Sequence, residues 1–201
     1  NTAKPVRLIE KDQGTLMGEI SLTSSQLTER YSLPVKVKET LTVQEIIHTQ
    51  AGEIVLDMGQ NMVGWLHVKL KGQIKKPITF RFAETLQPDG SLFTANLRSA
   101  KATDTYIPAW DAEFEWEPNF TYHGFRYVEI SGLSYKPALH VFTGKVIYDK
   151  METTGEFETS NPVINQIYKN AYWGIRGNYR GMPTDCPQRD ERLGWLGDRT
   201  T

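Results

Sequence analysis

The sequence is poor in cysteine and in long apolar runs. Cys186 is the single cysteine among 201 residues, which excludes an internal disulfide and a cluster of thiolate metal ligands and leaves the redox compartment open. No run approaches the roughly 18 consecutive apolar residues of a membrane helix. Residues 1–5 contain neither an initiator methionine nor the apolar core of a signal peptide. We therefore expect no membrane partner, and the compartment stays unassigned.

An excess of charge of one sign is also missing. The 23 basic and 24 acidic residues are spread along the chain and leave a formal net charge of −1. This balance creates no field that attracts a polyanion, so nucleic acid is not an expected partner. Hydrophobic residues make up 39% of the chain, which is enough for a buried core and argues against disorder. The length allows one large domain, or a medium domain plus part of another.

Strand patterns dominate the middle of the chain. Apolar and polar residues alternate in residues 65–71 and again in 78–82, the period of a strand with one buried face. Further strands are expected at 35–38, 54–56, 104–107, 114–117, 125–130 and 140–148. Short strands separated by glycine and proline, without a helical period between them, favour an antiparallel β-sandwich.

The pattern changes after residue 148. Residues 149–158 are polar and are expected to form a linker or a last edge strand. Asn161 followed by Pro162 predicts the start of a helix. That helix has an apolar stripe with a period near 3.6, formed by Ile164, Ile167, Ala171 and Ile175. Because two sheets bury their faces against each other, we expect this stripe to pack on further helices that lie C-terminal to this chain.

These patterns divide the chain into four parts. Residues 1–49 are unassigned or belong to a β domain, and 50–148 form the sandwich. Residues 149–160 are a linker, and 161–201 begin a helical catalytic domain. The chain stops three residues after its most chemically loaded segment, and we expect it to be an internal piece, truncated at both ends.

That segment, residues 185–198, contains four carboxylates, two arginines and a tryptophan. Cleavage of a glycosidic bond needs one carboxylic acid to protonate the leaving oxygen and a second carboxylate to activate water or attack the sugar. Neighbouring carboxylates help to keep one acid protonated, and others accept hydrogen bonds from sugar hydroxyls. Surface ion pairs are the simpler interpretation of such a cluster, and composition alone does not decide between the two.

The order of the residues in this segment is more specific. The string Asp185-Cys186-Pro187-Gln188-Arg189-Asp190-Glu191-Arg192-Leu193-Gly194-Trp195, followed by Gly197-Asp198, resembles the signature of bacterial α-L-rhamnosidases of glycoside hydrolase family 78. Further segments are similar to the family in the same order: 56–65, 81–84, 96–104 and 120–127. Met58 stands where the family usually has an aromatic residue. The resemblance covers residues 50–201, and 1–49 match no family segment.

The resemblance implies a mainly β fold, a concanavalin-like antiparallel β-sandwich followed by the first helix and loop of a truncated (α/α)6 barrel. It implies hydrolysis of terminal α-L-rhamnose with inversion, on a rhamnose-containing oligosaccharide or glycoside, by general acid and base catalysis. No cofactor or metal is expected. By correspondence with the family motif, Glu191 is the general acid, and the residues that line the rhamnose pocket are Asp185, Arg189, Trp195 and Asp198, with Asp190 as a further candidate.

The general base of the family lies in a later part of the barrel. We therefore expect Glu191 to be exposed in this chain, and the chain alone to be inactive, because inversion needs both carboxyl groups. A non-catalytic carbohydrate-binding or scaffold sandwich remains an alternative, as does another (α/α)6 glycosidase or a lyase.

Several other residues have simpler structural interpretations. His123 is expected to be a hydrogen-bonded structural group. Asn61 and Asn96 are expected to shape turns. Three tryptophans, Trp65, Trp110 and Trp116, are expected in the core.

Overall fold

The computed structural model describes residues 32–73 and 75–197, and the chain divides into two units, 1–31 and 32–201. Expectations for residues 1–31 therefore lie outside the described residues. The strands are β1 (Val35–Thr42), β2 (Glu45–His48), β3 (Ile54–Lys71), β4 (Ile78–Ala83), β5 (Thr85–Leu86), β6 (Leu92–Phe93), β7 (Thr103–Tyr106), β8 (Glu113–Trp116), β9 (His123–Ser131) and β10 (Phe142–Asp149). The helices are η1 (Ala95–Leu97), η2 (Leu139–Val141) and α1 (Pro162–Gly177).

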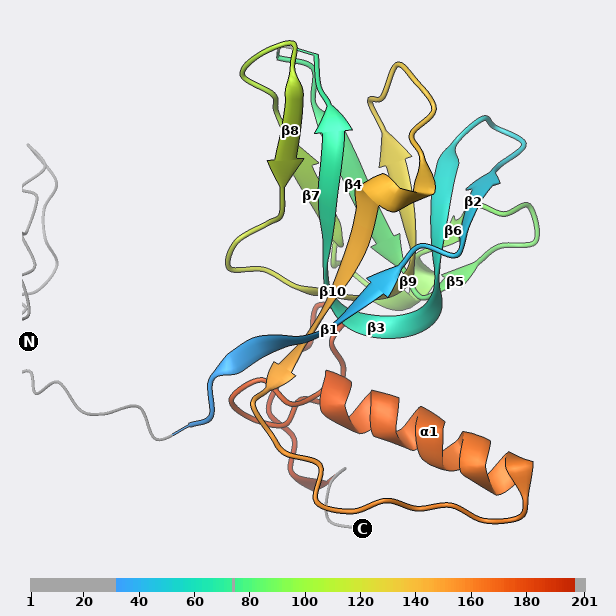
Figure 1. Cartoon of the computed structure of the whole chain (residues 1–201), viewed down its shortest axis with the longest axis vertical. Coiled ribbons are helices and arrows are strands. Elements are labelled where there is room, and N and C mark those ends of the chain that lie inside the picture. Colours follow the sequence, from blue (N-terminus) through green and yellow to red (C-terminus); the bar gives the residue numbers. More distant parts are fainter. Residues whose placement is uncertain (1–31, 74, 198–201) are drawn as a thin grey trace, which may run out of the picture. The chain divides into compact units, whose positions relative to one another are not determined.

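The main sheet is antiparallel throughout and follows the order β1-β10-β3-β9-β4-β7, with β2 and β8 also paired to β3 (Figure 1). The two strands expected at 54–56 and 65–71 are the two ends of the single long strand β3. Its pairing with β9 shifts between Asp57 and Met62, where the strand bends. The bend lets one strand pair with β2 at one end and with β8 and β10 at the other.

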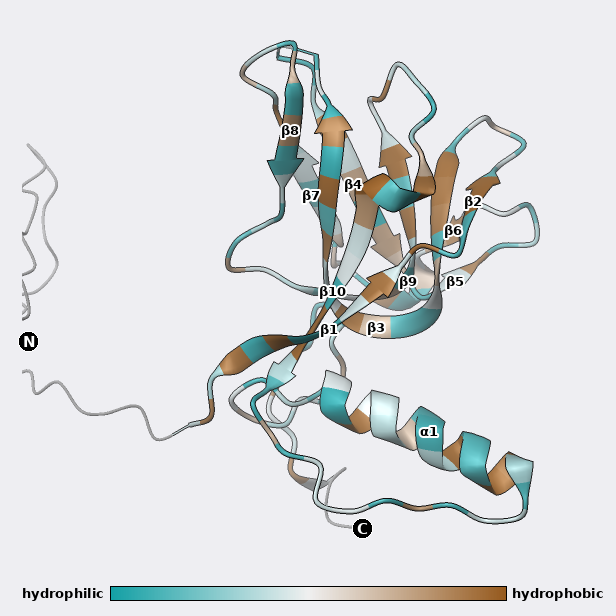
Figure 2. Ribbon diagram, viewed as in Figure 1, coloured by the Kyte–Doolittle hydropathy of each residue, from teal (hydrophilic) through white to brown (hydrophobic). Residues whose placement is uncertain are grey.

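The core lies between strands whose apolar residues alternate as the sequence predicted (Figure 2). Its largest fully buried side chains include Phe80, Phe82, Phe125 and Phe142, from β4, β9 and β10. Trp116 stacks on Phe80, with ring centroids 5.8 Å apart. The prediction for Trp110 is wrong, because it lies in the turn between β7 and β8 and is 74% exposed.

Helix α1 begins where the capping pattern predicted. The Asn161 side chain accepts a hydrogen bond from the Val163 backbone N–H at 2.9 Å, and Pro162 occupies the first turn. The predicted apolar stripe is exposed among the described residues, at Ile164, Ile167, Ala171 and Ile175. The expected packing of this stripe is thus not met within the described part of the chain. No helix there has the length and apolar character needed to span a bilayer.

The C-terminal end of α1 is attached to the sheet through one arginine. Arg176 is 5% exposed and forms two hydrogen bonds with the Glu39 carboxylate of β1, at 2.5 and 3.1 Å. Its guanidinium also lies over the rings of Tyr148 and Trp173. A buried charge of this kind is tolerated only when it is paired and hydrogen-bonded, so this contact fixes where α1 ends against the sheet.

The segment after α1 has little regular structure. Its own pairing consists of two isolated bridges, Tyr179 with Pro183 and Thr184 with Gly194. The sheet holds it from outside: the Asp149 carboxylate accepts from the Gly181 N–H at 2.8 Å. The position of residues 178–197 therefore depends on contacts with the sheet.

One of these contacts is close packing at Gly124 of β9. A Cβ atom at this position would lie 2.9 Å from Cγ of Pro187, 3.0 Å from Cβ of Gln188 and 3.2 Å from the Gln188 backbone nitrogen. Real Cβ atoms rarely approach backbone this closely. The absence of a side chain at Gly124 is thus a condition for the 185–192 segment to lie on the sheet.

Gly124→Ala should lower the free energy of unfolding by about 1–3 kcal/mol, because the added methyl group overpacks the contact. Gly155→Ala is the matched control, since nothing lies within 4 Å of a Cβ at that position. Both changes restrict the unfolded chain equally, so the difference between them measures the clash. Urea unfolding of the two variants checks this, and equal stabilities would contradict the packing argument.

An ion pair also fixes the bend of β3. Arg126 of β9 donates two hydrogen bonds of 2.8 Å to the Asp57 carboxylate, which accepts a third from the Gly59 N–H at 2.6 Å. The hydrogen bonds from Arg126 outweigh partial burial and lower the pKa of Asp57 below its ordinary value of 3.8. The ionised carboxylate therefore stabilises the fold above about pH 4, and this contribution disappears as the pH falls through the lowered pKa.

Asp57→Asn should destabilise the chain by about 1 kcal/mol at pH 7, a modest effect because Arg126 is partly exposed. The difference from the unmodified chain should be full above about pH 4 and should shrink as the pH falls below it, because the unfolded chain binds a proton at Asp57 more readily than the folded chain. Urea unfolding between about pH 7 and pH 2 measures the effect, with Glu152→Gln at an exposed position after β10 as the control. A difference that stays constant with pH would be contrary to this assignment.

Candidate active site

Three of the residues singled out in the sequence form one ion-pair cluster. Nη2 of Arg189 lies 2.9 Å from Oδ2 of Asp185 and 3.1 Å from Oε2 of Glu191. A single guanidinium therefore joins the expected general acid to a carboxylate of the expected rhamnose pocket. The planar group donates a hydrogen bond to Asp185 and forms an ion pair with Glu191 through the same nitrogen.

Glu191 has a second cationic partner, from the β-sandwich. Nη1 of Arg98 lies 2.7 Å from the same oxygen, Oε2. The Glu191 side chain is 21% exposed, so the expectation of an exposed acid is wrong. The loop that follows η1 covers this carboxyl group, and this cover does not depend on any barrel helix.

The pKa values of Asp185 and Cys186 are shifted in opposite directions. Partial burial disfavours the charged form of Asp185, but hydrogen bonds with the Cys186 thiol and the Arg189 guanidinium outweigh it and lower the pKa of Asp185. This carboxylate is ionised near neutral pH and acts as a hydrogen-bond acceptor. Burial raises the pKa of the Cys186 thiol, so the thiol stays neutral and is not an activated nucleophile.

The remaining predicted residues are not drawn into this cluster. The Asp190 carboxylate turns to the sandwich, where it accepts hydrogen bonds from the Ser99 backbone N–H at 3.3 Å and from the Ser99 hydroxyl. Trp195 is partly exposed, and its backbone N–H donates to the Pro183 carbonyl. Asp198 lies outside the described residues.

No spacing pattern in the sequence indicated which residues of the sandwich contact the cluster. Arg98 and Ser99 are 93 and 91 residues away from their partners. Arg192 donates to the Tyr122 carbonyl at 3.3 Å, and its guanidinium lies 4.6 Å from the Tyr122 ring centroid. Arg98 and Tyr122 fall within segments that resemble the family, which was the only available signal.

A metal ion is a further possibility for these acids. One ligand atom each from Asp185, Cys186 and Glu191 lies within 4.8 Å of the others. The Arg189 guanidinium already bridges the two carboxylates, and Arg98 forms a second ion pair with Glu191. A cation would have to displace these arginines, so the residues present fit an ion-paired site better than a metal centre.

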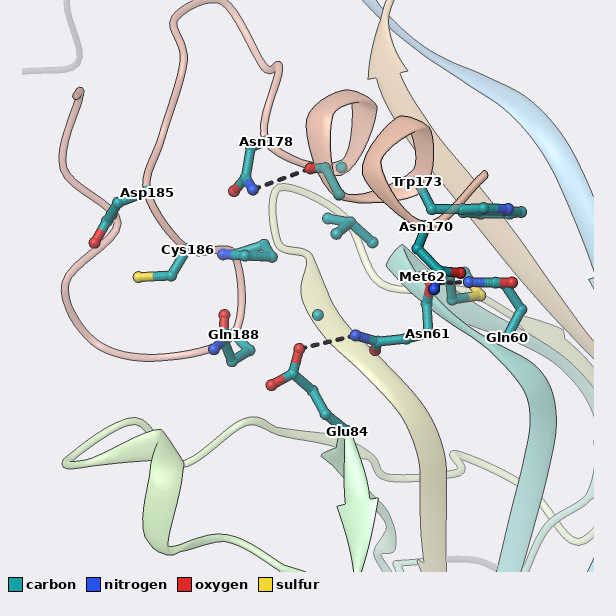
Figure 3. Close-up of a pocket in the computed structure, with 15 residues that line it drawn as sticks. Gln60, Asn61, Met62, Glu84, Asn170, Trp173, Asn178, Asp185, Cys186 and Gln188 are labelled. Atoms are coloured by element: carbon teal, nitrogen blue, oxygen red, sulfur yellow. Dashed lines mark hydrogen bonds between the residues drawn. The ribbon is translucent and has the colours of Figure 1, made fainter. Parts of the chain in front are cut away.

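A cavity of about 400 Å³ lies on the other side of the 185–188 loop (Figure 3). Its wall includes Glu84, Gln188 and the end of α1. Asp185 lines this cavity as well as belonging to the ion-pair cluster, whereas neither Arg189 nor Glu191 lines it. This amide-rich cavity therefore borders the ion-pair cluster at Asp185.

Glu84 accepts hydrogen bonds from two asparagines of the sandwich. Asn61 donates to its Oε1 at 3.0 Å, and Asn96 donates to its Oε2 at 3.2 Å. The prediction that these asparagines shape turns missed this shared carboxylate. His123 is buried, pairs with Asp104 at 2.9 Å and stacks on Phe82, which agrees with a structural role.

Comparison with known proteins places the two halves of the chain. Residues 47–148 match the bacterial alpha-L-rhamnosidase concanavalin-like domain, and residues 152–201 match the bacterial alpha-L-rhamnosidase 6 hairpin glycosidase domain. These matches agree with the predicted mainly β fold followed by the start of a helical domain.

Individual relatives agree. An alpha-L-rhamnosidase of Streptomyces avermitilis is 45% identical over 173 residues, which cover 86% of this chain and 17% of that protein. The crystal structure of the alpha-L-rhamnosidase from the same organism, complexed with L-rhamnose, superposes with a TM-score of 0.80 at 46% identity, over 83% of this chain and 16% of that one. An alpha-L-rhamnosidase structure from Dictyoglumus thermophilum gives a TM-score of 0.80 at 43% identity, over 83% and 19% of the two chains.

The chain spans 17% to 21% of the length of three curated relatives, and its two parts match two successive domains of one kind of glycosidase. The chain therefore belongs to the bacterial α-L-rhamnosidases.

Proposed function

We propose that this chain is a section of a longer α-L-rhamnosidase that removes terminal α-L-rhamnose with inversion, and that Glu191 is its general acid. The observation that carries this proposal is the cluster in which Arg189 joins Glu191 to Asp185. It lies in the segment that matches the glycosidase domain. The proposed substrate is a rhamnose-containing oligosaccharide or glycoside, supported by the relative that was crystallised with L-rhamnose.

Each residue of the segment has a role in this proposal. Glu191 donates the proton to the leaving oxygen. Asp185 is ionised and accepts hydrogen bonds from sugar hydroxyls, while Arg189 orients both carboxyl groups. Asp190 and Asp198 are further pocket residues, and the face of Trp195 packs on the sugar ring.

The general base comes from another part of the parent protein. An inverting site places its two carboxyl groups about 6.5–9.5 Å apart, with a water molecule between them. Asp185 and Glu191 lie closer than this, since carboxylate oxygens of the two residues are within 4.8 Å of each other. They do not form the acid–base pair, and we propose that this chain alone is inactive.

The domain division is part of the proposal. Residues 50–148 form the sandwich, 149–160 the linker and 161–201 the start of the helical domain, with 1–49 unassigned or part of a β domain. The pairing of β1 with β10 and of β2 with β3 favours the β domain for residues 35–48. In support, β10 ends at Asp149 and α1 begins at Pro162. The exposed stripe of α1 is the surface on which later barrel helices would pack.

The purified 201-residue chain should not hydrolyse an aryl α-L-rhamnoside above the rate of buffer, because it holds one half of the acid–base pair. Release of the chromophore measures this, with the full-length protein as the positive control. Turnover by the chain that is lost in Glu191→Gln would refute the assignment of the base to another part of the parent.

Glu191→Gln in the full-length protein should lower kcat on a natural rhamnoside by about 10²–10⁴, the usual contribution of a general acid. A dinitrophenyl rhamnoside needs no protonation of its leaving group, so the variant should retain most of its activity on that substrate. Glu156→Gln, in the exposed linker, is the matched control. Equal losses on both substrates would show that Glu191 is not the general acid. Inversion is tested independently, by NMR identification of the sugar anomer that forms first.

A further inference from the structure

We propose that the β-sandwich supplies part of the catalytic machinery, with Arg98 as a positioning residue for Glu191 and Ser99 as a positioning residue for Asp190. This inference rests on the proposed role of Glu191 as the general acid. It assigns the sandwich a function in the reaction beyond support for the helical domain.

The loop that carries both residues is fixed to the sheet at each end. Leu97 is buried in the core, just before Arg98. Asn96 donates to the Glu84 carboxylate, and beyond Arg98 the Ala102 carbonyl accepts from the Phe82 N–H of β4 at 2.9 Å. Arg98 and Ser99 therefore extend from a short loop between two anchors, which is the kind of support that precise positioning requires.

The backbone of this loop adopts a conformation that side chains disfavour. Arg98 has a φ of +57° and Ala102 a φ of +43°, both in the left-handed region although neither is glycine. Arg192, beside Glu191, has a φ of +46°. Such residues persist where the surrounding contacts impose the conformation, and they gather at functional sites. Here they lie on both sides of the Arg98–Glu191 contact.

The acid has little support from its own segment. Residues 185–192 form no helix or strand, so the side chain of Glu191 is held by its partners. Arg98 and Arg189 both contact Oε2. Among the described residues, no hydrogen bond or ion pair to Oε1 is found. The carboxyl group is thus held by one oxygen, and the other is left to carry the proton toward the leaving oxygen.

Asp190 is oriented by the same loop. Both the backbone N–H and the hydroxyl of Ser99 donate to Oδ2 of Asp190, one residue before Glu191. Hydrogen bonds from Ser99 lower the pKa of Asp190, so this anchor acts on a charged carboxylate. The two adjacent acids are therefore held by two adjacent residues of the sandwich, which fixes both the position and the rotation of this part of the segment.

A surface ion pair without function is the simpler alternative. The Arg98 side chain is 53% exposed, and pairs of this kind contribute little to stability. A stability measurement does not separate the two interpretations, whereas a dependence on the leaving group does, because it reports on proton donation by Glu191.

The test uses the full-length rhamnosidase with Arg98→Gln and Arg98→Lys, each assayed on a natural rhamnoside and on dinitrophenyl rhamnoside. Arg98→Gln should lower kcat on the natural substrate by about 10–100-fold, because a displaced acid donates poorly. On the dinitrophenyl substrate the loss should stay within about threefold, since that step does not use the acid. Arg98→Lys, which keeps one charge on the carboxylate, should recover part of the loss. Lys101→Gln is the control: it also removes one positive charge from this loop, and it should change the rate on neither substrate.

A second arm combines Arg98→Gln with Glu191→Gln. The double variant should be no slower than Glu191→Gln alone, because Arg98 acts through the carboxyl group that is already missing. Amide hydrogen exchange of residues 188–192 should rise in Arg98→Gln and not in Lys101→Gln, which shows directly whether the contact holds the segment.

Three results would overturn the inference: equal losses on both substrates, no loss on either, or a further fall in the double variant. If Glu191→Gln itself shows no dependence on the leaving group, the proposed acid is wrong and the role of Arg98 fails with it. If Glu191→Gln shows the dependence and Arg98→Gln does not, only the role of Arg98 is refuted.

Discussion

The close contact between β9 and the loop at Pro187 is the constraint on which the candidate site depends. The loop has two isolated bridges of its own, so its shape comes from the surface beneath it. Gly124 allows that surface to approach Pro187 and Gln188 without an intervening side chain. The positions of the Asp185 and Glu191 carboxylates depend on the same packing, because Arg189 bridges them only when the loop is folded in this way.

Arginine is the residue that joins the sandwich to the segment after α1. Arg176 fixes the end of α1 to Glu39, and the guanidinium groups of Arg180 and Arg192 lie 4.1 and 4.6 Å from the ring centroid of Tyr122. A planar, weakly hydrated cation stacks on an aromatic ring and donates from its edge at the same time. These contacts allow buried and half-buried arginines to join the sandwich to the segment after α1.

The fold was largely predictable, because it depends on local patterns. The alternation in residues 65–71 and 78–82 matches β3 and β4, and the Asn161-Pro162 pair marks the start of α1. Patterns of this kind need no knowledge of distant residues. They failed where context decides, as for Trp110, whose aromatic character predicts burial while its place in a turn exposes it.

The site was predictable only in part. Asp185, Arg189 and Glu191 lie within seven residues of one another, so one motif indicated all three. Arg98 is separated from Glu191 by 93 positions and reaches it only because β4, η1 and β9 bring the loop there. No spacing rule in a single sequence connects residues of that kind, since the fold itself determines the contact.

Cys186 gives this arrangement a practical use. Its thiol is 5% exposed, and burial raises its pKa, so it is protected from alkylating reagents by both access and ionisation while the loop lies on β9. Because it is the single thiol of the chain, its reactivity reports on detachment of the loop from β9. The rate at which a maleimide consumes it gives the frequency with which the acid-bearing segment lifts from the sandwich, without any label being added.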